Sequence, residues 1–259
     1  MLTKSRSRLI RSLHEKKHRN ELGLFLVEGG KCVKELMRSD FLIDHMLVTK
    51  EFHAANSNDL ADVAHDVCGK HDLQSLGTLQ SNDAAIAVVH QKANVSFEIG
   101  DDEMAIALDD IRDPSNLGSI IRIADWYGIK KIVASESTVD RYNSKAVSAT
   151  KGSFTRVRMF YTDLEKFLMG ARVPVLGTFL VGEDVHTFDF PTAGVLVMGN
   201  ESNGISTEAA RWIHTRLTIP SFGATESLNV AIASAVVLDN WRRTHHAGFP
   251  VNSARLAHM

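Results

Sequence analysis

The sequence predicts an α/β protein of two units: a small α/β unit over residues 1–92, and a larger unit over 104–259 built on a parallel sheet. Two observations lead to this fold class. Short apolar runs alternate with stretches of helical period, and in the second half the expected strands are apolar throughout. Such strands are typical of parallel sheets covered by helices on both faces. Residues 93–103 are polar and lack helical period, so we expect a linker there.

The first unit begins with a basic segment whose apolar spacing over residues 4–18 is that of a helix. A strand over 24–30 that closes on two glycines, a helix over 31–39 and a strand over 43–49 follow. A helix near 58–70 and a strand over 84–90 complete the unit. Residues 1–22 hold seven Lys or Arg against two Glu. This excess favours contact with phosphates and a merely solvated helix face about equally.

The second unit has the regular order of strands and helices that a parallel sheet requires. Strands are expected over 104–111, 130–135, 156–161, 173–180, 194–199 and 215–220. Helices are expected over 116–128, 142–153, 162–171, 205–214 and 227–245, the third with Thr162 as its N-cap. Residues 247–259 are expected to form a loose tail.

Composition and missing motifs exclude several classes of protein. Cys32 and Cys68 stand in no CxxC pair, which favours a reduced, cytoplasmic protein without disulfides or a structural zinc. No apolar run has the length of a membrane span or a signal peptide. The sequence lacks GxGxxG, P-loop, GxSxG and HExxH motifs, which argues against a dinucleotide enzyme or a conventional Rossmann methyltransferase. None of the 12 histidines has metal-ligand spacing, so no metal is expected.

Three stretches of the second unit place polar residues where a strand ends, which is where open α/β sheets bind ligands. The first holds Asp109, Asp113, Asn116 and Arg122. Each could serve the fold alone: Asn116 as a helix cap, the carboxylates in turns, and Arg122 on the surface. The second is GNESNG, residues 199–204, which could be no more than a good turn.

The third stretch precedes the last helix, where Glu226, Ser227 and Asn229 follow Gly223. One of these polar residues can cap the helix by accepting hydrogen bonds from its first free N–H groups. Because a cap needs only one of them, the others are expected to have another task.

Taken together, the three stretches resemble the three motifs of the SpoU (TrmH-type) branch of the SPOUT RNA methyltransferases. The first motif is carried by Asp109, Asp113, Pro114, Asn116, Gly118, Ile120, Arg122, Ala124 and Gly128; the second by Gly199, Asn200, Glu201, Gly204 and Ile205; the third by Ile219, Pro220, Gly223, Ser227, Leu228, Asn229, Val230 and Ala231. The segment KKHRNELGLFLVEGGKCVKELM also resembles the RNA-substrate-binding domain of ribosomal-RNA members. All three motifs, in this order and spacing, are highly specific.

The resemblance implies transfer of a methyl group from S-adenosylmethionine to a ribose 2′-hydroxyl, by a homodimer whose catalytic domain contains a deep trefoil knot. It implies cofactor contacts at Thr178, Gly199, Ile219 and Leu228. It also implies catalytic roles for Arg122, Asn116, Glu201, Ser227 and Asn229, with Glu201 orienting Asn229 or Arg122, and with Arg122 working near the cofactor of the other subunit.

Family accounts make the first-motif Arg a base, but a guanidinium is essentially always protonated. We therefore expect Arg122 to stabilise negative charge developing on the ribose oxygen and to position a phosphate. The proton then passes to water, a phosphate or Glu201. No metal is required, so the three aspartates Asp109, Asp110 and Asp113 return to structural roles.

The sequence departs from the family between the first two motifs. Many members have Asn-Pro-Lys followed three residues later by Arg or Gln, whereas this chain has Asn143-Ser144-Lys145 and then Ser148. The departure affects expected RNA contacts, although Lys145 and Lys151 could still meet phosphates. It does not affect the cofactor motifs.

We expect ribosomal RNA as the substrate because the N-terminal unit is present, which many tRNA-modifying members lack. The alternatives are a tRNA 2′-O-methyltransferase and a non-catalytic RNA-binding or ribosome-assembly factor. The retained motif residues argue against the non-catalytic alternative. A nucleotide-dependent dehydrogenase is disfavoured because the glycine-rich turn is absent.

Overall fold

The computed structural model describes residues 2–245. The N-terminal unit (residues 2–90) contains a four-stranded sheet in the order β1-β4-β2-β3, formed by Leu24–Glu28, Ala85–His90, Ile43–Val48 and His65–Val67. Strand β4 is antiparallel to β1 and β2, and β3 is parallel to β2, so the sheet is mixed. Five helices accompany it: α1 (Lys4–Ser12), α2 (Lys16–Leu22), α3 (Gly30–Met37), α4 (Lys50–Ala55) and α5 (Lys70–Leu76).

Successive residues of the first strand enter different cores. Phe25 and Val27 pack with α3, while Leu24 and Leu26 pack with α1 and α5. Because side chains alternate across a strand, both faces of this sheet are covered by apolar side chains.

Two expectations for this unit are wrong. The basic segment forms two helices and not one, because the Arg19 side chain turns inward and donates hydrogen bonds to the carbonyl oxygens of Leu13 and His14 at the end of α1. The helix expected near 58–70 is also absent. Residues 65–67 instead form β3, which pairs with the edge of β2, and the helix begins only at Lys70. Strand pairing here overrides local helical spacing.

The C-terminal unit (residues 104–245) is built on a six-stranded sheet in which every pairing is parallel, as expected. Its order is β10-β8-β9-β5-β6-β7. The strands are β5 (Met104–Leu108), β6 (Lys131–Ser135), β7 (Arg158–Thr162), β8 (Val175–Asp184), β9 (Gly194–Met198) and β10 (Thr215–Thr218). The helices are α6 (Pro114–Trp126), α7 (Ser144–Thr150), α8 (Leu164–Met169), α9 (Thr207–Ala210) and α10 (Val230–Thr244), with a short 3₁₀ turn over Ser153–Thr155.

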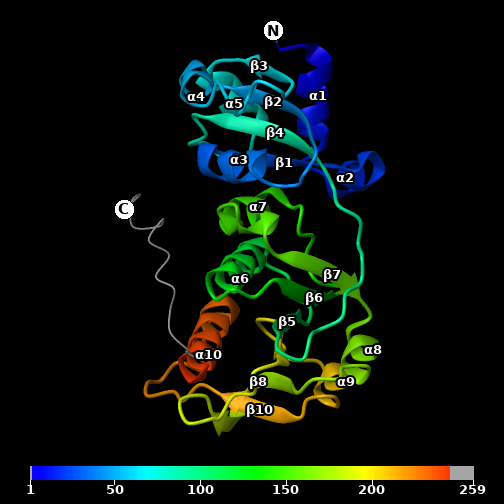
Figure 1. Ribbon diagram of the computed structural model, residues 1–259, viewed down its shortest axis with the longest axis vertical. Coiled ribbons are helices and arrows are strands. Elements are labelled where there is room, and N and C mark those ends of the chain that lie inside the picture. Colours follow the sequence, from blue (N-terminus) through cyan, green and yellow to red (C-terminus); the bar gives the residue numbers. More distant parts are fainter. Residues whose placement is uncertain (1, 246–259) are drawn as a thin grey trace.

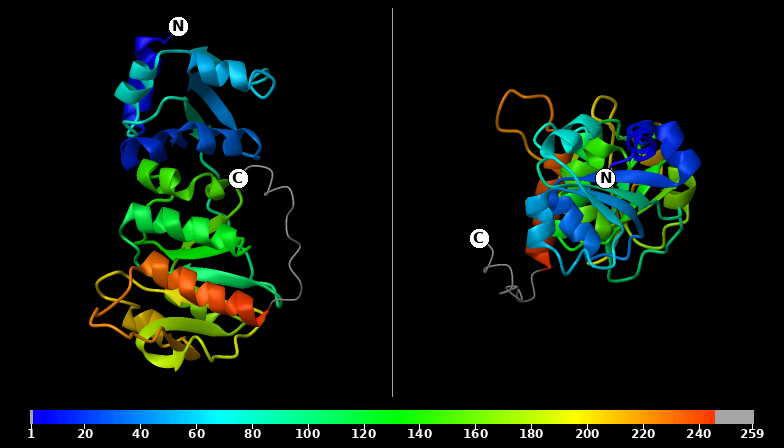
Figure 2. Two further views of the ribbon diagram at one scale, coloured as in Figure 1. Left: turned by 90° about the vertical axis from the view of Figure 1, so that its left-hand side faces the viewer. Right: turned by 90° about the horizontal axis from the view of Figure 1, so that it is seen from above.

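Helices cover both faces of this sheet. Helices α6 and α10 pack with the side chains of one face, and α8 and α9 with those of the other. Figure 2 shows α6 and α10 lying next to each other. Because β9 returns to lie beside β5, the carboxyl ends of β5 and β9 meet where the strand order reverses, which is the point where such sheets bind ligands.

Several boundaries differ from those expected. Thr162 is the last residue of β7, and Asp163 caps α8 by accepting a hydrogen bond from the Lys166 N–H. Strand β8 continues to Asp184, four residues beyond the apolar run, and α9 is a single turn. Helix α10 begins at Val230, since Asn229 is its cap. The tail expected over 247–259 lies outside the described residues.

The two units are stacked along the long axis of the molecule, and the chain that joins them passes down one side (Figure 1). Tyr142 and Val147 of the second unit pack into the N-terminal core around Phe25. Residues 91–103 contain no helix or strand, but Asn94 hydrogen-bonds the main chain of Tyr161 on the edge strand β7. Within the described residues, no helix is long and apolar enough to cross a membrane.

Candidate active site

The first helix of the site is fixed by carboxylates. The Asp113 side chain accepts hydrogen bonds from the N–H groups of Ser115 and Asn116, both at 2.8 Å, and Pro114 occupies the first turn. Asp109 accepts a hydrogen bond from the N–H of Ser206 at 2.7 Å. These aspartates therefore serve the fold, as expected, and the cap of α6 is Asp113 and not Asn116.

Because Asp113 caps α6, the side chain of Asn116 is available to hydrogen-bond residues of the second and third motifs. Its Nδ2 donates to Oε1 of Glu201 at 2.8 Å, and its Oδ1 accepts from Nδ2 of Asn229 at 2.9 Å. The Oδ1 of Asn229 in turn accepts from the N–H groups of Ala231 and Ile232 at the start of α10. We call Glu201, Asn116 and Asn229 the relay.

The direction of every hydrogen bond in the relay follows from its two ends. An ionised Glu201 can only accept, so the amide nitrogen of Asn116 must face it. The amide oxygen of Asn116 then faces Asn229 and requires a donor there. The free N–H groups of α10 require an acceptor on the other side of Asn229. Both amides are thereby held in one orientation, and Glu201 orients Asn229 through Asn116 without direct contact.

The second motif is a tight turn against the end of β5. Asn200 and Gly204 form an isolated antiparallel bridge, and Nδ2 of Asn200 donates to the main-chain oxygen of Asp110 at 2.8 Å. A Cβ on Gly199 would lie 2.2 Å from the carbonyl carbon of Gly204 and 2.3 Å from the nitrogen of Ile205. Only glycine fits at 199, because the turn folds back onto it. The sequence placed Asn200 in the second motif, but its spacing did not indicate that this side chain anchors the motif to Asp110.

The middle of the third motif is an open loop over residues 221–229. Phe222 is 95% exposed and Leu228 is 50% exposed. Ser227 is also exposed and makes no hydrogen bond within the described part of the chain. A Cβ on Gly223 would meet nothing within 4 Å. The loop therefore presents polar and apolar side chains, together with main-chain groups, to any ligand beside the relay.

Arg122 lies apart from the relay in a single chain. It is exposed on α6, and among residues 2–245 its guanidinium makes no hydrogen bond or ion pair. Trp126, one turn further along α6, is 73% exposed. Residues four apart share a helix face, so Arg122 and Trp126 stand together on the solvent side of α6.

Of the expected cofactor residues, Gly199 follows β9, Thr178 lies within β8, and Leu228 lies in the loop before α10. Thr178 is half-buried in β8, and its hydroxyl contacts Sδ of Met198 at 3.8 Å. Ile219 follows β10 and packs partly against the core. No main-chain N–H of residues 221–228 donates a hydrogen bond within the described chain, so these groups are open to a ligand.

Two cavities, of about 370 and 460 Å³, lie elsewhere, between the N-terminal unit and β7. Neither cavity is lined by a residue of the three motifs. Ile121, which lines the first cavity, lies on α6 between the motif residues Ile120 and Arg122. Across residues 2–245, no cluster of three or more His, Cys, Asp or Glu side chains could hold a metal ion.

Two known protein families match this chain, one over each of its units. The SpoU rRNA Methylase family matches residues 103–239, and the MRM3-like substrate binding domain matches residues 4–87. The 23S rRNA (guanosine(2553)-2′-O)-methyltransferase RlmP of Bacillus subtilis is 26% identical over 90% of this chain and 94% of its own length.

Two solved structures agree over almost the whole chain. A protein from Porphyromonas gingivalis that is assigned to the TrmH family is 31% identical, covers 94% of this chain and 99% of its own, and has a TM-score of 0.80. The AdoMet-bound rRNA methyltransferase from Sinorhizobium meliloti is 29% identical, covers 95% of this chain and 97% of its own, and has a TM-score of 0.85. The family predicted from the three motifs is thereby confirmed: this chain belongs to the SpoU rRNA methylase family, and it is an RNA 2′-O-methyltransferase.

Proposed function

We propose that this enzyme transfers a methyl group from S-adenosylmethionine to a ribose 2′-hydroxyl of ribosomal RNA. The observation that carries the proposal is the relay, because its hydrogen bonds join one residue from each of the three motifs. The relative from Bacillus subtilis acts on 23S rRNA, and the one from Sinorhizobium meliloti binds AdoMet.

The residues at the sheet edge fit the methyl donor. Unpaired main-chain N–H groups over 221–228 are available to polar atoms of its adenosine. Ile219 and Leu228 offer apolar contact beside them. Gly199 directly follows β9, and Thr178 lies within β8, one residue after Gly177, which pairs with Val197 of β9. We assign these four residues to cofactor binding. When bound, S-adenosylmethionine supplies an electrophilic methyl group, and the chain supplies orientation and charge.

The chemistry proposed for the side chains follows from their charge. Arg122 stays protonated, so it stabilises negative charge that develops on the ribose oxygen and holds a neighbouring phosphate. The relay fixes the start of α10 and keeps Ser227 and Asn229 beside the reacting groups. Glu201 or water accepts the hydroxyl proton. Correct placement against a sulfonium methyl group is expected to supply much of the acceleration. No metal takes part.

We also propose a homodimer, in which Arg122 of one subunit acts at the cofactor of the other. Arg122 is unpaired within residues 2–245 and shares its helix face with the exposed Trp126. Ile232, on α10 beside α6, is a further exposed apolar residue at 55%. Such apolar side chains around an unpaired arginine suit a subunit interface.

Two experiments test the dimer: a charged residue placed in the proposed interface, and the mixing of two inactive variants. Trp126→Glu is expected to shift the protein from dimer to monomer in light scattering and to abolish methyl transfer. Mixing Arg122→Ala with Asn229→Ala subunits is expected to restore up to about a quarter of the activity, because some mixed dimers then contain one intact shared site. A wild-type monomer, or a mixture as inactive as its components, would contradict the shared site.

The reaction itself is tested by mapping. Deleting the gene and mapping 2′-O-methylation across all rRNA and tRNA is expected to show one lost rRNA site. Wild type restores it, and so does Arg211→Ala, the control, which replaces an exposed arginine directly after α9. Arg122→Ala does not. A lost tRNA site would favour the tRNA alternative, and a site restored by Arg122→Ala would show that Arg122 is not needed.

Three further assignments belong to the proposal. Residues 1–92 form the RNA substrate-binding domain, 93–103 the linker and 104–259 the methyltransferase domain. The latter contains the deep trefoil knot, for which β9 between β8 and β5 is a compatible strand order. The enzyme works in the cytoplasm, where its two free cysteines, Cys32 and Cys68, would stay reduced.

A further inference from the structure

The junction between the two units contains a cavity of about 370 Å³ with an apolar floor and a cationic rim. This volume is in the range of small-ligand sites. The floor is formed by Ile121, Phe154, Val157 and Met159, and Phe41 closes one side. The rim carries Lys92, Arg141 and Arg158. A second, more open hollow of about 460 Å³ shares Lys92, Ala93, Arg141 and Tyr142 with the first, so these residues stand between the two.

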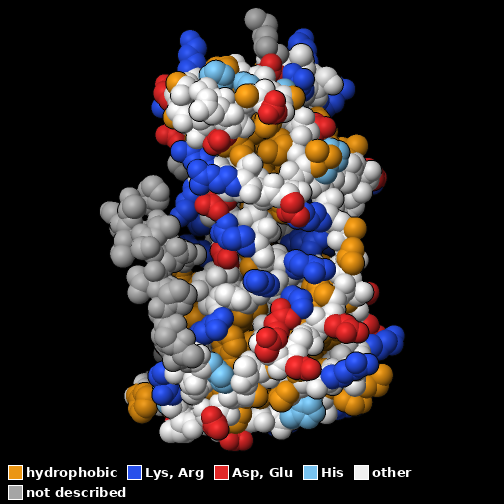
Figure 3. All heavy atoms as spheres, in the orientation of Figure 1, with side chains coloured by type: hydrophobic (Ala, Val, Ile, Leu, Met, Phe, Trp, Pro, Cys, Tyr) orange, Lys and Arg blue, Asp and Glu red, His pale blue; other side chains and the backbone are white. Residues whose placement is uncertain are grey.

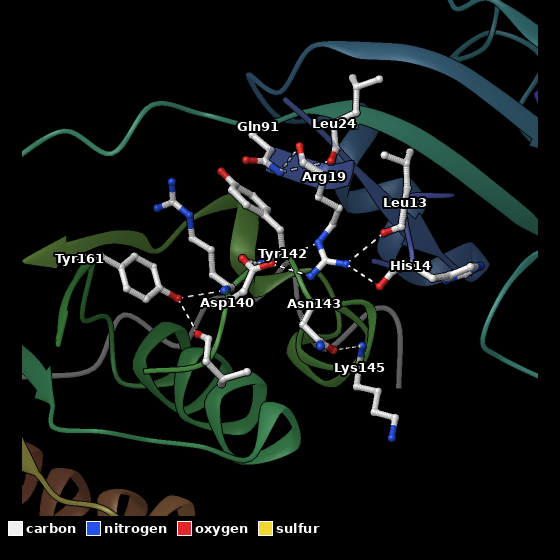
Figure 4. Close-up of polar contacts among 12 residues, drawn as sticks. Leu13, His14, Arg19, Leu24, Gln91, Asp140, Tyr142, Asn143, Lys145 and Tyr161 are labelled. Atoms are coloured by element: carbon white, nitrogen blue, oxygen red, sulfur yellow. Dashed lines mark hydrogen bonds and ion pairs between the residues drawn. The ribbon is translucent and has the colours of Figure 1, made fainter. Parts of the chain in front are cut away.

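The walls of this junction are held rigidly. Arg19 of α2, only 2% exposed, donates from Nε and Nη2 to Oδ2 of Asp140 at 3.1 and 2.7 Å, which ties the N-terminal unit to the segment after β6. The Tyr142 hydroxyl accepts a hydrogen bond from the N–H of Lys92 at 2.9 Å. The side chain of Gln91 donates to the main-chain oxygens of Arg19 and Leu24 (Figure 4). A site with fixed walls loses little entropy when a ligand binds.

The charges at the junction are not balanced. The carboxylate of Asp40 is paired with Lys92, and that of Asp140 with Arg19. Within residues 2–245, the guanidinium group of Arg141 donates only to the main-chain oxygens of Met159 and Lys92, and that of Arg158 has no carboxylate partner. Figure 3 shows Lys and Arg side chains gathered across the middle of the molecule, at the height where the units meet. Two guanidinium groups are therefore available to an anion.

We propose that the junction cavity binds one unpaired nucleotide of the RNA substrate, with its base on the apolar floor and its phosphates at Arg141 and Arg158. An apolar surface that accepts a base, next to arginines that follow the backbone, is the combination that single-stranded RNA requires. The inference rests on the proposed function, because it assigns a contact to that same substrate. The nucleotide is distinct from the methylated one, since no residue of the relay lines either hollow, and the relay joins α6 to the start of α10.

The test measures binding of fluorescein-labelled decauridylate by anisotropy, with two variants that perturb the cavity in different ways. Arg158→Ala removes an exposed cation that has no carboxylate partner among residues 2–245, and Arg211→Ala, at an exposed arginine that follows α9 and lines neither hollow, is its matched control. Ala93→Glu places a carboxylate between the two hollows, and Ala54→Glu repeats that charge change on the exposed side of α4. None of the four residues belongs to the relay or to the open loop over residues 221–229.

Both junction variants are expected to weaken wild-type binding about three- to tenfold, and Arg158→Ala to lower the slope of log K against log salt by about 0.7, the value of one single-strand phosphate contact. Both controls stay within about twofold of wild type. A hairpin duplex of the same length is expected to show no difference between Arg158→Ala and its control. The inference is overturned if wild type does not bind the probe, or if junction variants and controls bind alike. Failure of the proposed function is a separate result, namely absence of methyl transfer to rRNA by wild type.

Discussion

Replacing Asn229 separates the two tasks of this residue in the relay. Its Oδ1 caps α10, and its Nδ2 donates to Asn116. Asn229→Ala removes both interactions. Asn229→Asp keeps an acceptor for the cap but replaces the donor by a second acceptor, which faces the amide oxygen of Asn116. Asn116 could donate to the new carboxylate only by turning its amide, which would break its hydrogen bond to Glu201.

The magnitudes follow from these contacts. Loss of the cap costs about 1 kcal/mol, and loss of the exposed hydrogen bond to Asn116 costs about 0.5 kcal/mol. For Asn229→Ala the melting temperature is therefore expected to fall by about 3–6 °C. In Asn229→Asp the carboxylate at the N-terminus of α10 contributes about 0.3–1 kcal/mol, which offsets the lost bond, so Tm stays within about 2 °C of wild type.

Activity is expected to behave differently from stability. Both variants should lower kcat about 10- to 100-fold, because the start of α10 no longer holds the reacting groups in place. The assay is methyl transfer from labelled S-adenosylmethionine to rRNA at saturating RNA, with Tm measured by calorimetry. Asn143→Asp is the matched control, since Asn143 caps α7 in the same way but lies outside the relay. A stable Asn229→Asp enzyme with wild-type kcat would refute the relay as a catalytic device.

Three other predictions concern fold and cofactor. Gly199→Ala is expected to abolish calorimetric binding of S-adenosylmethionine, because its Cβ would collide with the main chain of 204–205, whereas Gly223→Ala, with open space around its Cβ, should bind normally. Arg19→Met leaves the half-buried carboxylate of Asp140 without its ion-pair partner. It is expected to lower the free energy of unfolding by about 3 kcal/mol, which is roughly 6–12 °C in Tm, and a Tm unchanged within error would contradict the buried ion pair. Burial, followed by the charge of Arg6, lowers the pKa of His45 below 6.5. Unfolding then lets this imidazole take up a proton, so stability falls as pH drops below about 6.5; in urea titrations, His45→Gln should lose less stability than wild type between neutral pH and pH 5.

Local pattern sufficed for much of the second unit. Its strands are short, nearly uninterrupted apolar runs. Such runs are typical of strands that are buried on both faces of a parallel sheet, so they predicted the sheet directly. The motif residues were found for the same reason, because the carboxyl ends of parallel strands must carry the ligand-binding loops. The least accurate expectations concerned short elements such as β3 and α9. In an element of three or four residues, strand pairing and helix caps decide the conformation more than the spacing of apolar residues does.

The sequence by itself determined the family, the parallel sheet and the identity of the motif residues, since these depend on residue types at fixed spacing. Only the tertiary structure decided how those residues are connected. It made Asp113 the cap and so freed Asn116 for Glu201 and Asn229, partners that are 85 and 113 positions away. It left Arg122 unpaired on the outer face of α6, and it formed the cationic junction from Arg19, Lys92, Arg141 and Arg158. Contacts between such distant positions arise from the packing of whole elements, which local sequence patterns do not record.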